Sequence, residues 1–420
     1  MKFGLFYELQ LPKPYDRETW DPEDEHRLYK EMLDQVELAD KLGFDYVFEV
    51  EHHFLEEYAH SSAPEIVLAA ASQRTKNIRL CHGIVIMPPR VNHPARVAER
   101  VAALDLVSDG RVEFGTGESS SEMELGGFGM PREEKKAQWE EATRECLRLM
   151  SSEPYPGYEG EFFGMPPRNV VPKPLQKPHP PVWVAASRRE TVLVAARLGI
   201  GSLGFSFETP DEAAERVQAY FELVREECFP IGKAINPAIA VLSSFMCAPT
   251  DEEAVEKARA GAPFFSFALS HYYGGAGADP HEPAGRNLWR EYVDTPAAVQ
   301  TQRLNSLASY RGQLGGSEAE AAEKEPEDEN ARALWRAARR GGTIGSPEYL
   351  RTNLRKYEAA HLDAMILVAQ CGDRKHEDIM ASIELFAREV MPEFKERHPQ
   401  HQEWRRQQLE GVEFPINSSI

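Results

Sequence analysis

The sequence predicts an α/β protein, and three observations lead to this fold class. Short apolar runs alternate with longer amphipathic stretches along most of the 420 residues, as strands and helices do in a parallel α/β fold. About eight strand–helix units can be counted, which is the number that closes a (β/α)8 barrel, the TIM barrel. A long interval, at about residues 262–345, separates the seventh unit from the eighth. We therefore expect a barrel with a long insertion at that point.

The first four units lie before residue 151. The first helix carries one apolar stripe, formed by Leu28, Met32, Val36 and Ala39, and stops at Gly43, a residue type common at helix C-termini. The expected strands are 3–7, 44–50, 78–87 and 111–115, and the expected helices are 26–42, 64–74, 94–107 and 131–150.

A proline-rich passage, 154–181, then interrupts the alternation. Its nine prolines exclude a regular helix or a central strand. Beyond this passage the expected strands are 182–186, 202–207, 238–247 and 364–369, and the expected helices are 190–198, 210–227, 251–259 and 376–390.

The insertion contains an aromatic run at 264–267, a stretch at 272–277 that we expect to be flexible, and an acidic tract at 318–329 that we expect to be a solvated face. Insertions of this length commonly form lids, substrate walls or oligomer contacts. For the domain organisation we expect one barrel over residues 1–394, with a polar surface tail over 395–420.

Composition excludes several classes of function. Lys and Arg total 48 against 68 Asp and Glu, so the formal charge of -20 disfavours nucleic acid and anionic membranes as partners. No apolar run approaches the roughly 20 residues that span a bilayer. The N-terminus resembles a first strand more than a signal peptide. Five scattered cysteines show no zinc-site spacing and indicate buried thiols in a reducing compartment, so we expect a cytoplasmic protein.

Chemistry is expected where Glu51, His52, His53 and Phe54 follow the second strand, because ligands bind at the carboxyl ends of parallel strands. An imidazole can exchange a proton at physiological pH. Adjacent residues at a strand end point to opposite sides, so only one of the two histidines is expected to face a pocket. That disfavours a shared metal, and no metal site is predicted. Alone, the pair is equally compatible with two polar residues at the barrel rim.

Three blocks of sequence resemble one family. They are Gly43 to Val47 followed by Glu51 to Phe54, the stretch from Leu104 to Gly117, and Pro180 to Ser187. Together they resemble the bacterial luciferase-like family of flavin-dependent monooxygenases, and the resemblance extends from Met1 to about Phe394.

The resemblance implies a homodimeric barrel that uses reduced FMN supplied by a separate flavin reductase. In that family dioxygen adds at the flavin C4a position, and the resulting C4a-peroxyflavin oxygenates a small, largely apolar organic substrate. By position, His52 corresponds to the catalytic imidazole, which stabilises the developing peroxide. His53 is a second, weaker catalytic candidate that could instead support the turn.

The resemblance also implies where FMN binds. The third strand would lie along the flavin ring, with Gly83 and Ile84 in an unusual backbone conformation, for which a cis bond is one hypothesis. His82 is expected either at the flavin edge or in the core. The phosphate is expected at the start of the helix after the fifth strand, near Ala186, Ser187, Arg188 and Thr191.

One position departs from the luciferase pattern. Glu118 stands where luciferase has a phosphate-binding arginine, so we expect Arg188 or the hydroxyls that begin at Ser119 and Ser120 to carry more of the phosphate binding. Candidate pocket walls are aromatic or acidic residues: Phe6, Glu8, Phe205, Phe207, Phe264 and Tyr272. Two alternatives stay open, namely a deazaflavin-dependent dehydrogenase on the same barrel and a non-catalytic flavin-binding partner subunit.

Overall fold

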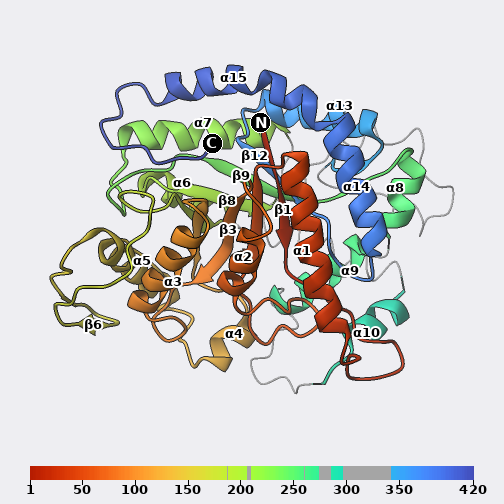
Figure 1. Ribbon diagram of the computed structural model, residues 1–420, viewed down its shortest axis with the longest axis horizontal. Helices are drawn as coiled ribbons and strands as arrows, with labels where there is room; N and C mark the ends of the chain where they lie inside the picture. The colour runs from red at the N-terminus through yellow and green to blue at the C-terminus, as the bar shows by residue number, and fades with distance from the viewer. Residues whose placement is uncertain (187, 206–209, 260, 274–284, 297–341) are drawn as a thin grey trace.

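The computed structural model describes residues 1–186, 188–205, 210–259, 261–273, 285–296 and 342–420 (Figure 1). Within these residues eight parallel strands close a barrel in the order β1-β12-β9-β8-β7-β4-β3-β2. The strands are β1 (Lys2–Tyr7), β2 (Tyr46–Val50), β3 (Arg79–Ile86), β4 (Val112–Gly117), β7 (Val182–Ala185), β8 (Gly201–Phe205), β9 (Ile239–Ser244) and β12 (Ala364–Val368). The predicted TIM barrel is confirmed.

Helices surround the barrel, as the ring of ribbons in Figure 1 shows. Their bounds before the insertion are α1 (Asp24–Leu42), α2 (Pro64–Ser72), α3 (Pro94–Val107), α4 (Glu122–Gly127), α5 (Lys135–Ser151), α6 (Arg189–Arg197), α7 (Pro210–Glu226) and α8 (Asp251–Ala258). The last barrel helix is α14 (His376–Glu389). The long helices bury apolar faces; in α1 the buried residues include Leu28, Met32, Val36 and Ala39. In the described part of the chain, no helix combines the length and the apolar character needed to cross a membrane.

The insertion follows β9 and is more regular near its start than the sequence indicated. The aromatic run at 264–267 lies in a helix, α9 (Ala262–Tyr273), so Tyr273 ends a helix where a flexible stretch was expected. α10 (Leu288–Asp294), β11 (Ile344–Gly345) and α13 (Pro347–Ala359) follow, and β11 pairs with β10 (Met246–Cys247). The proline-rich passage contains only the short hairpin of β5 (Tyr158–Glu159) and β6 (Gly164–Met165). The acidic tract lies outside the described residues.

The chain after Glu393, expected as a surface tail, continues a helix, α15 (Met391–Gln408), that packs on the amino end of the barrel. Its mean sequence is polar, but His401 and Arg405 are only 6% and 4% exposed. Both contact the carboxylate of Asp363, which precedes β12 and is itself completely buried. Beyond α15 the carbonyl oxygen of Ser419 accepts a hydrogen bond from Lys2 Nζ, so the two chain ends lie close together (Figure 1).

Replacing Asp363 with Ala is expected to lower the free energy of unfolding by about 3–5 kcal/mol, because it leaves the Arg405 cation buried without its anion. Burial raises the pKa of Asp363, but Arg405 and His401 outweigh burial and hold the pKa below its usual value. The stabilisation is therefore present at neutral pH and is lost as pH falls through that lowered pKa. Urea unfolding measures the change. The matched control is Asp34→Ala, which removes an exposed pair with Arg74 and is expected to cost less than about 1 kcal/mol.

Candidate active site

A cavity of about 510 Å³ opens at the carboxyl ends of the barrel strands. That volume lies within the range of small-molecule and cofactor sites. Its walls come from the ends of β1, β2, β3, β4, β7, β8 and β9, from the starts of α5 and α6, and from α4 and α9. The position is the one at which TIM barrels carry their active sites.

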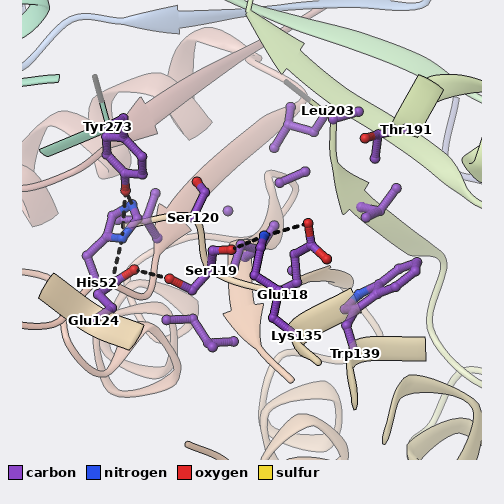
Figure 2. Close-up of a pocket in the computed structure, with 18 of the residues that line it drawn as sticks. His52, Glu118, Ser119, Ser120, Glu124, Lys135, Trp139, Thr191, Leu203 and Tyr273 are labelled. Carbon is purple, nitrogen blue, oxygen red and sulfur yellow. Dashed lines mark hydrogen bonds and ion pairs between the residues drawn. The ribbon is translucent and has the colours of Figure 1, made fainter. Parts of the chain in front are cut away.

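His52 lies at one end of this cavity, just beyond β2 (Figure 2). Its Nδ1 lies 2.9 Å from Glu124 Oε1, on α4, and its Nε2 lies 3.4 Å from Glu8 Oε2, just beyond β1. The hydroxyl of Tyr273, at the end of α9, is 3.3 Å from either ring nitrogen. Four separate segments of the chain therefore fix one imidazole in the cavity wall.

The surroundings of His52 set its charge. Burial lowers the pKa of His52, but Glu124 and Glu8 outweigh burial and raise the pKa from 6.5 to about 9. Burial also opposes ionisation of Glu124, yet His52, Ser119 and the His53 backbone N–H stabilise the carboxylate and lower its pKa. At neutral pH His52 is therefore a cationic proton donor that Glu124 holds in place.

The middle of the cavity is apolar, and the backbone of β3 lies close to it. Gly83 and Ile84 of β3 line it, and a Cβ built on Gly83 would come within 3.2 Å of the Phe6 ring. The pairing of β3 with β4 shifts register between Cys81 and Val85, so this stretch is irregular as expected. The irregularity is not a cis bond at Gly83–Ile84: the cis bonds in the described residues precede Pro154, Pro172 and Pro178.

Cationic residues gather at the other end of the cavity. Lys135, at the start of α5, donates to Glu118 Oε1 at 2.7 Å and to the carbonyl oxygen of Ser119 at 2.8 Å (Figure 2). The charge of Glu118, which we expected to repel a phosphate, is thus countered by a lysine at the start of α5. Lining residues at this end carry four positive charges against two negative ones: Arg132, Lys135, Lys136 and Arg188 against Glu118 and Glu190.

The start of α6 borders the same end. Arg188 is its N-cap residue, and among the described residues no side chain caps the first turn; a helix start of this kind suits an anion. Arg188, Thr191 and Ala186 all line the cavity, as do Glu118, Ser119 and Ser120. Trp139 of α5 completes this wall and donates from Nε1 to Thr116 Oγ1 at 3.1 Å.

The sequence-predicted site residues divide into three groups. Those that line the cavity are Phe6, Glu8, His52, Gly83, Ile84, Glu118, Ser119, Ser120, Ala186, Arg188 and Thr191. Four others lie outside its lining: His53, His82, Phe264 and Tyr272. Ser187 and Phe207 fall outside the described residues, as does the side chain of Phe205.

The residues outside the lining have other surroundings. His53 lies 3.1 Å from Glu51 Oε1 and packs edge-on against Phe128, on the side of the strand end away from the cavity. His82 is buried between β3 and β4, with Nδ1 3.3 Å from the Glu113 carbonyl oxygen, which is the core placement left open above. Phe264 packs against Trp289 and Tyr292, on α10.

Sequence reasoning missed Glu124, Tyr58, Lys135 and Trp139. Tyr58 follows the histidine motif closely, whereas the other three lie far from it in sequence, on helices whose position depends on the closed barrel. The one available signal was local: Glu124 follows the fourth strand closely, where barrel enzymes place functional groups. In the described residues, no group of His, Cys, Asp and Glu has a geometry that could hold a metal ion.

Several known proteins are similar to this chain in sequence. The family model for luciferase-like monooxygenases matches residues 1–364. The oxygenase component of a flavin-dependent trigonelline monooxygenase from Acinetobacter baylyi is 26% identical over 94% of this chain and 96% of that protein. An uncharacterized protein from Sinorhizobium fredii is 34% identical over 173 residues, so the match spans about half of that relative, 49%.

Solved structures share the fold. The oxygenating constituent of 3,6-diketocamphane monooxygenase from Pseudomonas putida, in complex with FMN, aligns with a TM-score of 0.65 at 18% identity, over 93% of this chain and 98% of that one. An F420-dependent secondary alcohol dehydrogenase aligns with a TM-score of 0.62 at 19% identity, over the same shares. At these identities the structures support the fold alone. The match of the family model over most of the sequence carries the classification: the chain belongs to the luciferase-like monooxygenase family and is a flavin-dependent oxidoreductase.

Proposed function

We propose that this protein is the oxygenase component of a two-component monooxygenase that uses reduced FMN and dioxygen on a small, largely apolar organic substrate. The observation that carries the proposal is the partly buried, cationic His52 in the wall of a cavity whose opposite end is rich in Lys and Arg. The separate reductase is part of the proposal because the Acinetobacter relative is the oxygenase component of its monooxygenase.

The residues present fit FMN. The apolar middle, where Gly83 brings the β3 backbone against the cavity, suits a flat ring. The cationic end suits a phosphate, because Lys135, Arg188 and the uncapped start of α6 all offer N–H donors there. When bound, reduced FMN supplies the electrons that activate dioxygen at its C4a carbon.

The chain's own residues then have defined tasks. His52 presents a ring N–H to the cavity and stabilises negative charge that develops on oxygen near it. Glu124 keeps that ring protonated and oriented. Phe6, Leu203 and Leu242 exclude water from the reacting centre.

A test is rapid mixing of the protein, loaded anaerobically with reduced FMN, with oxygenated buffer. We expect a transient absorbance distinct from reduced and oxidised flavin, and oxidation slower than that of free flavin. Oxidation at the rate of free flavin would argue against the proposal. A second candidate is an F420-dependent dehydrogenase, because an F420-dependent glucose-6-phosphate dehydrogenase from Intrasporangium calvum is 31% identical over 180 residues, 41% of this chain and 52% of that protein. Tight binding of F420 with weak binding of FMN would select it.

Replacing Lys135 with Met is expected to weaken FMN binding by about tenfold or more, because it removes a phosphate donor and leaves Glu118 unneutralised. Riboflavin, which has no phosphate, serves as the internal control and is expected to lose much less affinity. Fluorescence titration measures both dissociation constants. The variant Arg188→Ala tests the other wall of the phosphate site in the same assay. Equal losses for FMN and riboflavin would place the phosphate elsewhere.

A further inference from the structure

Glu8 is a buried carboxyl group with one oxygen that lacks a hydrogen-bond partner. It lies just beyond β1, lines the cavity and is 2% exposed. Its Oε1 accepts from the Tyr58 hydroxyl at 3.0 Å, whereas its Oε2 has no hydrogen bond. The nearest cation, His52 Nε2, is at ion-pair distance, 3.4 Å. A buried oxygen of this kind is costly unless a ligand satisfies it.

Aromatic side chains share this end of the cavity with Glu8. Phe6, Tyr58 and Tyr273 line it, and the ring centroids of Tyr58 and Tyr273 are 6.0 Å apart. The faces of aromatic rings attract cations, most strongly where water is excluded. The Lys and Arg residues of the lining lie around Glu118 and α6, and in Figure 2 Lys135 and Tyr273 lie on different sides of the cavity. At the Tyr273 end of the cavity, two carboxyl groups, Glu8 and Glu124, flank the imidazole of His52.

We propose that the substrate carries a cationic nitrogen on an apolar body, and that Glu8 together with the rings of Phe6, Tyr58 and Tyr273 recognises that nitrogen. The ligand class includes protonated and quaternary amines and N-alkylated aromatic rings. This inference rests on the proposed function, since it assigns the substrate end of the same cavity. Glu8 acts here as the specificity-determining residue, and the hydroxyl of Tyr58 holds its carboxylate in position.

The test compares two molecules that differ by one atom. N-methylpyridinium and toluene have the same shape, but only the first is charged. We expect the full-length protein to bind N-methylpyridinium about tenfold or more tighter than toluene in calorimetric titrations, with and without FMN. In Glu8→Gln, which keeps the side-chain shape, the preference should disappear while toluene affinity stays the same. Glu384→Gln, an exposed change of equal charge on α14, should retain the preference.

The pH dependence gives a second measurement that needs no variant. Burial raises the pKa of Glu8 from 4.5 to about 7, against the lowering effects of His52 and Tyr58, and Glu124 raises it further. Glu49, buried on β2, has a pKa that burial and the charge of Glu8 hold well above its usual value. Because His52 stays protonated and Glu124 stays ionised, the change of charge in this group of three comes from Glu8. Lowering the pH from roughly 8 to roughly 6 should therefore weaken N-methylpyridinium binding by about tenfold and leave toluene unaffected.

Equal affinity for the two probes, a preference that survives Glu8→Gln, or a cation affinity that does not change with pH would each overturn the assignment. None of these measurements involves oxygen or turnover. A protein that prefers the cation but does not stabilise oxygenated flavin would refute the proposed function and keep the cation site. A protein that stabilises oxygenated flavin but shows no preference for the cation would keep the proposed function and refute the cation site.

Discussion

The variant His52→Ala is expected to lose about 10²–10⁴-fold in product formed per reduced flavin consumed, the range typical of a positioned acid–base group. The physical reason is the charge of this side chain: two carboxyl groups keep the imidazole protonated in a buried wall, where its N–H is worth more than in water. Alanine removes the donor and leaves the cationic residues at the opposite end of the cavity intact.

The measurement separates chemistry from binding. The FMN dissociation constant should change by less than about threefold, which excludes a general loss of the site. The neighbouring variant His53→Ala is the matched comparison, since this ring contacts Glu51 and Phe128 outside the cavity lining. A larger loss in His53→Ala than in His52→Ala would reverse the assignment of the two histidines.

The second large effect is expected for Glu124→Gln. The amide keeps the shape but removes the charge that does most to keep His52 protonated against burial. The pKa of His52 should fall by about 1–3 units, the usual effect of one close opposite charge. Because His52 acts in its protonated form, the high-pH limit of productive oxygenation should move down by the same interval.

The pH profile is the decisive measurement for this residue, because Glu124 acts through His52. A merely structural role would lower activity equally at all pH values. Glu124→Asp, which restores the charge on a shorter side chain, should recover part of the high-pH activity. An unchanged profile in Glu124→Gln would mean that other groups protonate His52.

Much of the fold was predictable because strand and helix periodicities are local. The helix at 94–107 has the predicted bounds, and most other elements differ from prediction by a few residues. Helix α15 was not predicted: it is polar on average, and the buried contacts of His401 and Arg405 with Asp363 depend on the closed barrel. Helix α9 was missed because its aromatic residues do not form one stripe.

The site was predicted in the parts that strands supply. His52, Glu8, Gly83 and Glu118 follow or end barrel strands, so the carboxyl-end rule locates them. Glu124 and Lys135 come from helices that meet only in the folded protein; the nearness of Glu124 to the fourth strand was a weak local signal, and no local pattern marks Lys135. In the sequence Glu118 appeared unfavourable for phosphate binding. Its ion pair with Lys135 changes that interpretation.

Barrel closure has a consequence for how this protein is made. The first strand pairs with the last, Lys2 with Ala364 through Leu5 with Leu367. The strand between β1 and β9 is β12. A ribosome must therefore release nearly the whole polypeptide before β12 can pair with either of them. Until then both present open backbone edges that can pair with other nascent chains. The yield of native protein in a host is expected to depend on translation speed, temperature and chaperone supply.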